Sequence, residues 1–427
     1  MIWSKYNILF HKEGVYLFYN SLSNAFAELS EETYNLLAGL KAGEFFSVEN
    51  ETLMDNLKRM KAVVENDQEE VLKIKYNTLI HRFDNHFISL TINPTLGCNF
   101  ACPYCFEGEH SNVYMTDEVE DGIIDFIKRK TDAKRLDVTW FGGEPLLAFQ
   151  RIVSLTRKMQ SLGLIYSAGM ITNGYLLNKT IISQLEVLDI KKMQITIDGL
   201  RENHDKRRFL KGGQPTFDRI VENIDLLNLL APNIHVNIRV NIDSDNMNNF
   251  VNVFDYFYQK HYTNISVTPA FVEDHAGDNS CAFNSREKFT FYIELFQKYG
   301  MNFNSFYPSY KLSECSIRNQ NVAVIGPKGE IYKCWNDVGK QERIVGNIWG
   351  EVLNQRLLLQ YLTGADPFDD AQCKECILLP ICSGGCPYLR LMQQSKNHNL
   401  GEVCPLMKLD IETYLWLHYQ SKKEKRP

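Results

Sequence analysis

The sequence has no long apolar run and no excess of positive charge. No stretch of 18 apolar residues occurs in the 427-residue chain, so no membrane-spanning helix is predicted. The N-terminus has no charged segment followed by an apolar one, so we expect no secretory signal and a cytoplasmic protein. The formal net charge of -6 implies no broad basic surface and argues against a nucleic-acid or membrane binder.

The composition gives no sign of disorder or of a fibre. Hydrophobic residues make up 44% of the chain and charged residues 23%, as in an ordinary globular protein. The length suggests about three domains on a prior of roughly 150 residues each. The chain has 11 cysteines, which in a protein that is not exported are expected to be metal ligands rather than disulfides.

Three of these cysteines, Cys98, Cys102 and Cys105, lie within eight residues of one another. A short loop of this kind can direct three thiolates to three corners of a cubane iron–sulfur cluster, leaving one iron open to a small molecule. Buried thiols or a zinc site are the alternatives. Zinc would need a fourth Cys or His close by, and His110 is the candidate.

The spacing Cys-x3-Cys-x2-Cys, with Tyr104 before the third cysteine, resembles the motif of the radical S-adenosylmethionine (radical SAM) enzymes. The resemblance implies that the open iron binds the amino and carboxylate groups of the methionine part of SAM. An electron from the cluster would then cleave the sulfonium and give a 5′-deoxyadenosyl radical. In such enzymes the cofactor carries the chemistry, and the protein orients it.

From residue 86 the pattern alternates between strand and helix. Six strand–helix units predict a parallel sheet with right-handed crossovers, and the resemblance implies an open, partial (β/α)6 barrel. The expected strands lie at 88–92, 136–141, 168–172, 193–197, 235–242 and 265–269, and the expected helices at 116–130, 146–162, 179–188, 216–230, 248–259 and 285–299.

Loops after these strands are expected to bind the cofactor, because active sites of such barrels lie at the C-terminal ends of the strands. The loop Gly142, Gly143, Glu144 and Pro145 resembles the family motif that holds the SAM amino group. Its glycines allow close backbone approach, and its carboxylate would complement the ammonium.

Two further loops fit the same interpretation. Thr172 and Asn173 could offer polar groups to the ribose, although Asn-Gly is also an ordinary turn pair. Thr196 and Arg208 resemble a family segment that supplies a hydroxyl and an arginine towards the SAM carboxylate or ribose. For Arg208 a surface salt bridge is the alternative.

Seven more cysteines follow residue 300, and their spacing resembles the SPASM domain, which carries two auxiliary 4Fe–4S clusters in many peptide-acting radical SAM enzymes. With the first cluster, this implies three 4Fe–4S clusters. The resemblance assigns a distal set, Cys373, Cys376, Cys382 and Cys404, and a proximal set, Cys315, Cys334 and Cys386. A zinc ribbon is the alternative for these cysteines.

The proximal set has one thiolate fewer than a full cluster needs. Cys281 is either the missing ligand or a buried bystander, and we favour the bystander because free Cys is often a buried apolar residue. An open iron there could bind a substrate thiolate. Residues 329–334 predict a hairpin that presents Cys334, and residues 346–348 are expected to close a small sheet.

Residues 1–85 are expected to form a separate domain. Two apolar runs, at residues 6–10 and 15–19, flank Gly14 and predict a hairpin. Ser30 is a good helix start, and residues 53–64 predict a second helix. The arrangement resembles a winged-helix-like element that binds a leader peptide as an added strand. A lid on the catalytic domain is the alternative.

The predicted domains are therefore 1–85 for peptide recognition, 86–300 for the barrel and 301–427 for the SPASM domain. Together they favour an enzyme that abstracts hydrogen from a ribosomally made precursor peptide and forms a crosslink, a thioether by preference and a carbon–carbon bond next. An electron donor such as flavodoxin or ferredoxin is the other expected partner.

Two alternatives stay open. An anaerobic sulfatase-maturating enzyme would carry Asp directly after the cysteine corresponding to Cys334 and would lack the N-terminal domain. Here Trp335 follows, and Asp337 comes two residues later. A non-catalytic iron–sulfur or zinc protein that binds peptides is the other alternative, but it would not need an open iron beside a Gly-Gly-Glu-Pro loop.

Overall fold

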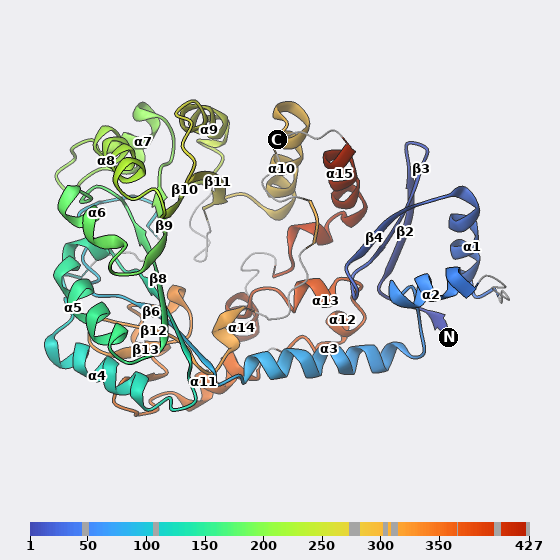
Figure 1. Cartoon of the computed structure of the whole chain (residues 1–427), viewed down its shortest axis with the longest axis horizontal. Helices are drawn as coiled ribbons and strands as arrows, with labels where there is room; N and C mark the ends of the chain where they lie inside the picture. The colour runs from blue at the N-terminus through green and yellow to red at the C-terminus, as the bar shows by residue number, and fades with distance from the viewer. Residues whose placement is uncertain are drawn as a thin grey trace. The chain divides into compact units, whose positions relative to one another are not determined.

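The computed structural model describes residues 1–44, 51–105, 111–272, 282–301, 306–308, 315–364, 366–396 and 403–423 (Figure 1). The chain divides into two compact units. One contains residues 84–283 and 319–362, and the other residues 1–83, 284–318 and 363–427. The predicted domain boundaries at residues 85 and 300 stay predictions. Among the described residues, no helix is both long and apolar enough to cross a membrane.

The unit of residues 84–283 and 319–362 contains a nine-stranded sheet. Six consecutive strands run parallel, and each pairs with the next one along the chain, which confirms the six predicted strands. They are β6 (Phe87–Ile92), β7 (Arg135–Trp140), β8 (Ile165–Thr172), β9 (Ile190–Thr196), β10 (His235–Ile242) and β11 (Ile265–Phe271).

Helices connect these strands close to the predicted positions. Thr116 caps α4 by accepting a hydrogen bond from the Val119 amide, and acidic residues follow in the first turn, where they complement the helix dipole. The predicted helix at 146–162 begins with a 3-10 turn, η1 (Pro145–Ala148). The others are α4 (Asp117–Lys128), α5 (Phe149–Gln160), α6 (Lys179–Leu185), α7 (Arg201–Arg207), α8 (Phe217–Leu230), η2 (Met247–Asn249) and α9 (Phe250–Tyr258).

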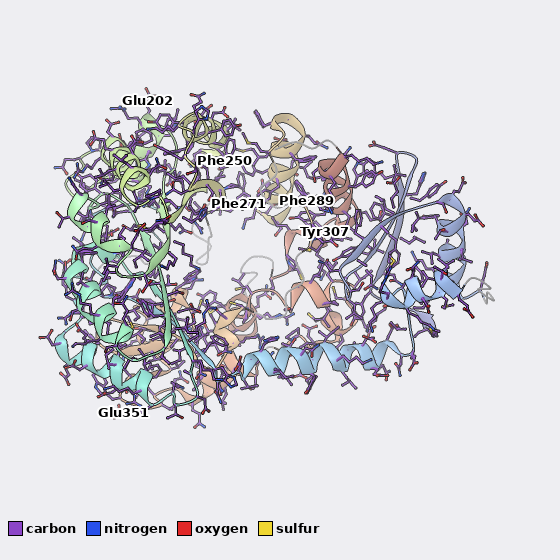
Figure 2. The ribbon with its side chains drawn as sticks, viewed as in Figure 1. Glu202, Phe250, Phe271, Phe289, Tyr307 and Glu351 are labelled. Carbon is purple, nitrogen blue, oxygen red and sulfur yellow. The ribbon has the colours of Figure 1, made fainter. Side chains whose placement is uncertain are left out.

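Side chains alternate along the strands, so each strand has one apolar face and one mixed face. On β10, Val236, Ile238 and Val240 are fully buried, whereas Arg239 and Asn241 on the opposite face are partly exposed. α9 packs against β10, and its residue Phe250, labelled in Figure 2, is also fully buried. Arg239 and Asn241 are therefore placed away from these buried residues.

The expected small sheet around Cys334 is instead an extension of the barrel sheet. The hairpin forms, because β12 (Val322–Ile325) pairs antiparallel with β13 (Glu330–Tyr332), and β13 with β14 (Gly346–Asn347). However, β12 also pairs in parallel with β6. All four residues of β12 are buried, as expected of a strand with neighbours on both sides and cover on both faces. η4 (Trp335–Asp337), η5 (Gln341–Arg343) and α11 (Gln355–Leu362) complete this stretch.

The other unit begins with a three-stranded sheet, β2 (Asn7–Lys12), β3 (Val15–Asn20) and β4 (Ala25–Leu29), which confirms the predicted hairpin. Glu13 and Gly14 form its turn, both with positive φ. Ser30 caps α1 (Glu31–Lys41), as predicted.

The predicted helix at 53–64 is shorter than expected. α2 (Glu51–Arg59) ends before Val64, which lies in β5 (Val63–Val64) and pairs with β1 (Ile2–Trp3). The following helix, α3 (Asp67–Arg82), was not predicted. Its exposed face carries Leu72, Tyr76 and Ile80, so apolar residues do not mark a single face of the helix in the sequence.

The N-terminal sheet shares a hydrophobic core with the C-terminal part of the chain. Phe10, Leu17 and Tyr19 pack with Leu378, Ile381, Leu415 and Trp416, and Cys376 and Cys382 lie against this cluster. Phe289 and Tyr307 belong to the same unit (Figure 2). Its remaining elements are α10 (Ser285–Tyr299), η3 (Ser316–Arg318), α12 (Ala371–Lys374), α13 (Leu379–Cys382), α14 (Pro387–Lys396), η6 (Leu406–Lys408) and α15 (Ile411–Lys423).

A buried ion pair fastens the end of α3 to the C-terminal part of this unit. Arg82 Nη1 lies 2.6 Å from Asp366 Oδ2, and the two side chains are only 2% and 6% exposed. Because Asp366→Ala removes the carboxylate from a buried guanidinium, we expect the free energy of unfolding to fall by about 3–5 kcal/mol, measured by anaerobic urea denaturation.

The matched control is Asp369→Ala. Asp369 is 73% exposed and pairs with Lys75 at 3.9 Å, so its loss should change the free energy of unfolding by less than about 1 kcal/mol. Equal effects of the two substitutions would contradict the assignment of Asp366 as a buried structural partner.

Candidate active site

A cavity of about 340 Å³ lies at the C-terminal ends of the parallel strands. All of its lining residues belong to the unit of residues 84–283 and 319–362. Nine of them are predicted site residues, namely Cys98, Cys102, Cys105, Gly142, Gly143, Thr172, Asn173, Thr196 and Arg208. The rest are Phe100, Tyr104, Phe141, Ile171, Gln194, Arg239, Asn241, Phe271, Val272, Trp335 and Asn336.

The three cysteines of the first loop all line this cavity. Burial raises the pKa of Cys98 to about 12, and it also raises the pKa of Cys102. The Phe100 amide, 3.4 Å from Cys98 Sγ, and the nearby Arg208 oppose these shifts. Thiolates in this loop therefore need a positive centre beside them.

The two glycines pack against the backbone that precedes Cys98. A Cβ on Gly143 would lie 2.3 Å from the Gly97 carbonyl oxygen, and one on Gly142 would lie 2.3 Å from that of Thr95. Gly142 also has a φ of 112°, which favours glycine. The Glu144 amide donates to the Gly97 carbonyl at 2.8 Å. The Gly142–Gly143 loop therefore packs directly against the cysteine loop.

Glu144 and Pro145 do not line the cavity. Glu144 is fully buried, and its carboxylate accepts hydrogen bonds from Thr172 Oγ1 at 2.7 Å, from the Asn173 amide at 2.7 Å and from the Leu146 amide at 3.0 Å. Burial raises the pKa of this carboxyl, and the donors oppose the shift. Glu144 thus orients the loop that presents Thr172 and Asn173, and its contact with an ammonium stays a prediction.

Arg208 lies at the cavity, not in a surface salt bridge. Its Nη1 donates to the Tyr104 hydroxyl at 2.9 Å, and its guanidinium lies 5.6 Å from the centre of the Phe100 ring. Its Nε is a buried donor with no hydrogen-bond partner in the described part of the chain. Thr196 also lines the cavity.

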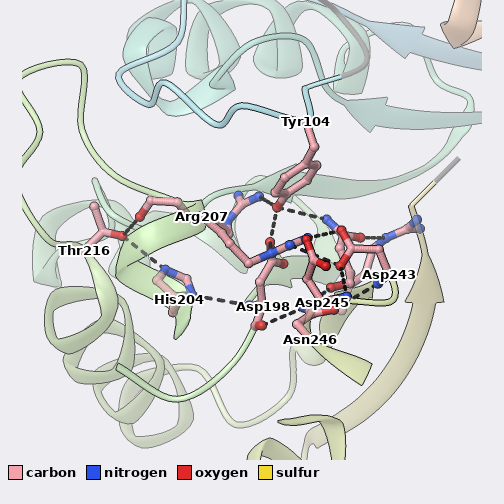
Figure 3. A network of polar contacts seen from close by, with 11 residues as sticks. Tyr104, Asp198, His204, Arg207, Thr216, Asp243, Asp245 and Asn246 are labelled. Carbon is pink, nitrogen blue, oxygen red and sulfur yellow. Dashed lines mark hydrogen bonds and ion pairs between the residues drawn. The ribbon is translucent and has the colours of Figure 1, made fainter. Parts of the chain in front are cut away.

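A buried polar network behind Arg208 was not predicted (Figure 3). Tyr104 donates to the fully buried Asp198, whose pKa is raised by burial against the opposing effect of Arg208 and Arg207. Arg207 lies 4.8 Å from the centre of the Tyr104 ring and donates to both carboxylate oxygens of Asp243, at 3.2 and 2.8 Å. The network anchors Tyr104, and with it the end of the cysteine loop.

His204 extends this network to Thr216 and does not line the cavity (Figure 3). Its Nδ1 lies 3.3 Å from the Asp198 amide, and its Nε2 lies 3.1 Å from Thr216 Oγ1. Burial, aided by Arg208, lowers the pKa of His204 well below its usual value. The imidazole is therefore neutral and structural.

The stretch after Cys334 contributes two cavity residues, Trp335 and Asn336, but not Asp337. Trp335 lies beside Phe141, with ring centres 5.9 Å apart. Asp337 is fully buried and accepts from Tyr361 Oη at 2.6 Å and Arg343 Nε at 2.7 Å. Among the described lining residues there is no Asp, Glu, His or Lys.

The remaining predicted ligands divide between the two units. The thiol of Cys382 has its pKa raised by burial and by the nearby Cys404, Cys376 and Cys373, so the distal set comes together. Cys334 belongs to one unit and Cys315 and Cys386 to the other, so the proximal set stays a prediction. Cys281 and His110 lie outside the described residues.

Comparison with known families agrees with this geometry. Residues 92–257 match the Radical SAM superfamily. These residues therefore form a radical SAM domain. This match favours an enzyme over the alternative of a non-catalytic iron–sulfur or zinc protein.

Two curated relatives are sulfatase-maturating enzymes. The serine-type anaerobic sulfatase-maturating enzyme of Bacteroides thetaiotaomicron is 24% identical over 340 residues, covering 68% of this chain and 80% of the relative. The cysteine-type enzyme of Clostridium perfringens is 24% identical over 353 residues, covering 74% and 93%.

Two solved structures share the fold. Native anSMEcpe with bound AdoMet aligns with a TM-score of 0.60 and 20% identity over 78% of this chain and 97% of that chain. Streptococcus suis SuiB bound to precursor peptide SuiA aligns with a TM-score of 0.56 and 16% identity over 92% and 97%. At these identities the likeness establishes the radical SAM α/β fold with its parallel-sheet core.

The radical SAM family implies a 4Fe–4S cluster and SAM, and the cavity fits both. In the described residues, no group of three or more His, Cys, Asp or Glu side chains could hold a metal ion. A cubane cluster does not need its thiolates to converge on a single metal ion, because each thiolate binds a different iron of the cluster. Three thiols around one cavity meet that need, and the buried Arg208 Nε offers a donor to a SAM carboxylate.

Gly143→Ala tests the close contact of the two loops. The new Cβ would meet two backbone carbonyl oxygens, of Gly97 at 2.3 Å and of Leu96 at 2.5 Å. It would therefore separate the Gly142–Gly143 loop from the cysteine loop. We expect SAM cleavage to deoxyadenosine under anaerobic reducing conditions to fall about a hundredfold. Gly212→Ala is the control, because its Cβ meets only the Gln214 side-chain amide. Unchanged cleavage in Gly143→Ala would contradict the contact.

Proposed function

We propose that this enzyme matures a ribosomally made precursor peptide by forming a crosslink, with a thioether as the preferred product and a carbon–carbon bond next. The observation that carries the proposal is the N-terminal sheet, whose strand β4 pairs only with β3 among the described strands. SuiB, which was solved with a precursor peptide, aligns over 92% of the chain, whereas anSMEcpe aligns over 78%.

Residues 1–85 would recognise the leader of the peptide. Every residue of β4 is at least partly exposed, whereas the first four residues of β2 are buried. An edge strand presents unpaired backbone groups, to which an extended peptide can add as a further strand. We therefore assign the β4 edge as the leader-binding site.

The cavity would hold the cluster and SAM. Cys98, Cys102 and Cys105 would ligate three irons, and the bound cofactors would supply a deoxyadenosyl radical that removes a substrate hydrogen. The predicted SAM contacts are Gly142, Gly143, Glu144, Pro145, Thr172, Asn173, Thr196 and Arg208. Phe141, Phe271 and Trp335 give the cavity apolar surface and would help to exclude water from the radical.

Thioether formation removes two hydrogens from the peptide, one as an atom by the radical and one as a proton from the cysteine thiol. The remaining electron needs an acceptor. We assign this role to auxiliary clusters in the SPASM domain, residues 301–427, with Cys373, Cys376, Cys382 and Cys404 as the distal ligands and Cys315, Cys334 and Cys386 as the proximal ones. A flavodoxin or ferredoxin would supply the electron that cleaves SAM.

Sulfatase maturation is the second candidate, favoured by the two curated relatives. Formylglycine formation in that group is expected to use an Asp next to the cysteine matching Cys334. Here that position is Trp335, and Asp337 is held by Arg343 and Tyr361 inside the protein. This geometry supports the crosslinking proposal over the sulfatase one.

The deciding experiment uses reconstituted enzyme, SAM, reductant and a small cysteine-containing peptide encoded beside the gene. We expect about twelve irons per chain, the count for three cubanes, and loss of two hydrogens from the peptide by mass spectrometry. Cys98→Ala/Cys102→Ala/Cys105→Ala should abolish deoxyadenosine while retaining the auxiliary iron. Conversion of a sulfatase peptide to formylglycine, with no change in the neighbouring peptide, would favour the second candidate.

Hydrogen–deuterium exchange tests the leader site directly. On addition of the same precursor peptide we expect slower exchange of the β4 amides, because an added strand occupies the open edge. The control region is α8, where exchange should not change. A peptide that is modified without any protection of β4 would place the leader elsewhere.

A further inference from the structure

Two cationic side chains donate hydrogen bonds to sulfurs of the distal cysteine set. Arg390 Nη2 lies 2.6 Å from Cys373 Sγ, and Lys408 Nζ lies 3.2 Å from Cys404 Sγ. No role in the SAM site accounts for either residue, since neither lines that cavity. Their two acceptors are separated by 31 residues in the chain but belong to one predicted cluster.

The loop after Cys382 explains how these segments meet. Ser383, Gly384 and Gly385 all have positive φ, so the chain reverses sharply. A Cβ on Gly385 would lie 2.1 Å from the Val403 carbonyl oxygen, which directly precedes Cys404. The backbones of the two segments are therefore in contact. Cys404, Cys376 and Cys373 lie close enough to raise the pKa of Cys382, so four thiols of suitable chemistry for a 4Fe–4S cluster are neighbours.

Arg390 is fixed in place by two other partners. Its Nε donates to the Gly384 carbonyl at 2.6 Å, and its Nη1 donates to Asp370 Oδ2 at 3.1 Å. The Arg390 side chain is only 11% exposed. Asp370 in turn accepts from the Cys373 amide at 3.1 Å. The guanidinium thus points a nearly buried, permanent positive charge at one sulfur.

We propose that Arg390 and Lys408 are positioning residues that set the reduction potential of the distal auxiliary cluster. This inference rests on the cluster assignment in the proposed function. Hydrogen bonds to the sulfurs, net charge and solvent exposure all set the potential of such a cluster. Two cations beside the thiolates stabilise the reduced, more negative form and make the cluster a better electron acceptor.

The couple concerned is the one-electron reduction of the cluster, from the 2+ to the 1+ core, with dithionite as the external reductant in the test. Arg390 should contribute more than Lys408, because Lys408 is exposed and its charge is screened by water. In the proposed reaction, the same couple would accept the electron left when the crosslink closes.

The test is a potentiometric titration of the reconstituted full-length protein, followed by electron paramagnetic resonance, with iron quantified in parallel. The distal signal is identified as the one lost in Cys376→Ala. In Arg390→Gln and Lys408→Met we expect full iron content and a distal midpoint potential shifted to more negative values. The shift should be larger for Arg390→Gln, larger still in the double variant, and partly restored in Arg390→Lys.

Arg59→Gln and Lys58→Met are matched controls, because both residues are exposed on α2, and neither should shift any potential. Full iron content with an unchanged distal potential would overturn the proposal. Loss of distal iron in Arg390→Gln and Arg390→Lys alike would also overturn it, by assigning Arg390 a purely structural role. If Cys376→Ala removes no iron, the cluster assignment itself fails, whatever peptide the enzyme modifies.

Discussion

The contact between the Gly142–Gly143 backbone and residues 95–97 is the constraint on which the site depends. It sets how far the cysteine loop lies from the loops that follow β7 and β8, because no side chain fits between the two backbones. Glu144 then links this contact to Thr172 and Asn173 through two hydrogen bonds. The predicted cluster ligands and SAM contacts are thereby held in fixed relative positions, as radical chemistry requires if the reactive carbon is to meet only its substrate.

Charge balance around the cysteine loop follows from the same packing. The cavity carries two guanidinium groups, Arg208 and Arg239, and no carboxylate among its described lining residues. The carboxylates lie behind it, with Asp198 bonded to Tyr104 and Asp243 bonded to Arg207. The guanidinium groups therefore line the cavity that holds the thiols, whereas Asp198 and Asp243 lie outside its lining. A second set of cations, Arg390 and Lys408, repeats this arrangement at the distal cysteines.

Most of the barrel could be predicted from the sequence, because strand β10 and helices such as α4 have strong local patterns and caps. The cavity residues on strand ends were predicted from motif spacing. Asp198, Arg207 and Asp243 were not, because their role arises from contacts between residues far apart in the chain, 94 positions for Tyr104 and Asp198 and 36 for Arg207 and Asp243. The pairing of β12 with β6 was missed for the same reason: a buried apolar strand does not reveal its neighbour.

The hydrophobic cluster that joins the N-terminal sheet to Cys376 and Cys382 has a consequence for how the protein responds to air. Groups that share one core are thermodynamically linked, so anything that stabilises one stabilises the other. Oxidative loss of the proposed distal iron–sulfur cluster would loosen the packing under Phe10, Leu17 and Tyr19, and with it the sheet proposed to bind the leader. In the proposed function, loss of that cluster would therefore also weaken leader binding at this sheet.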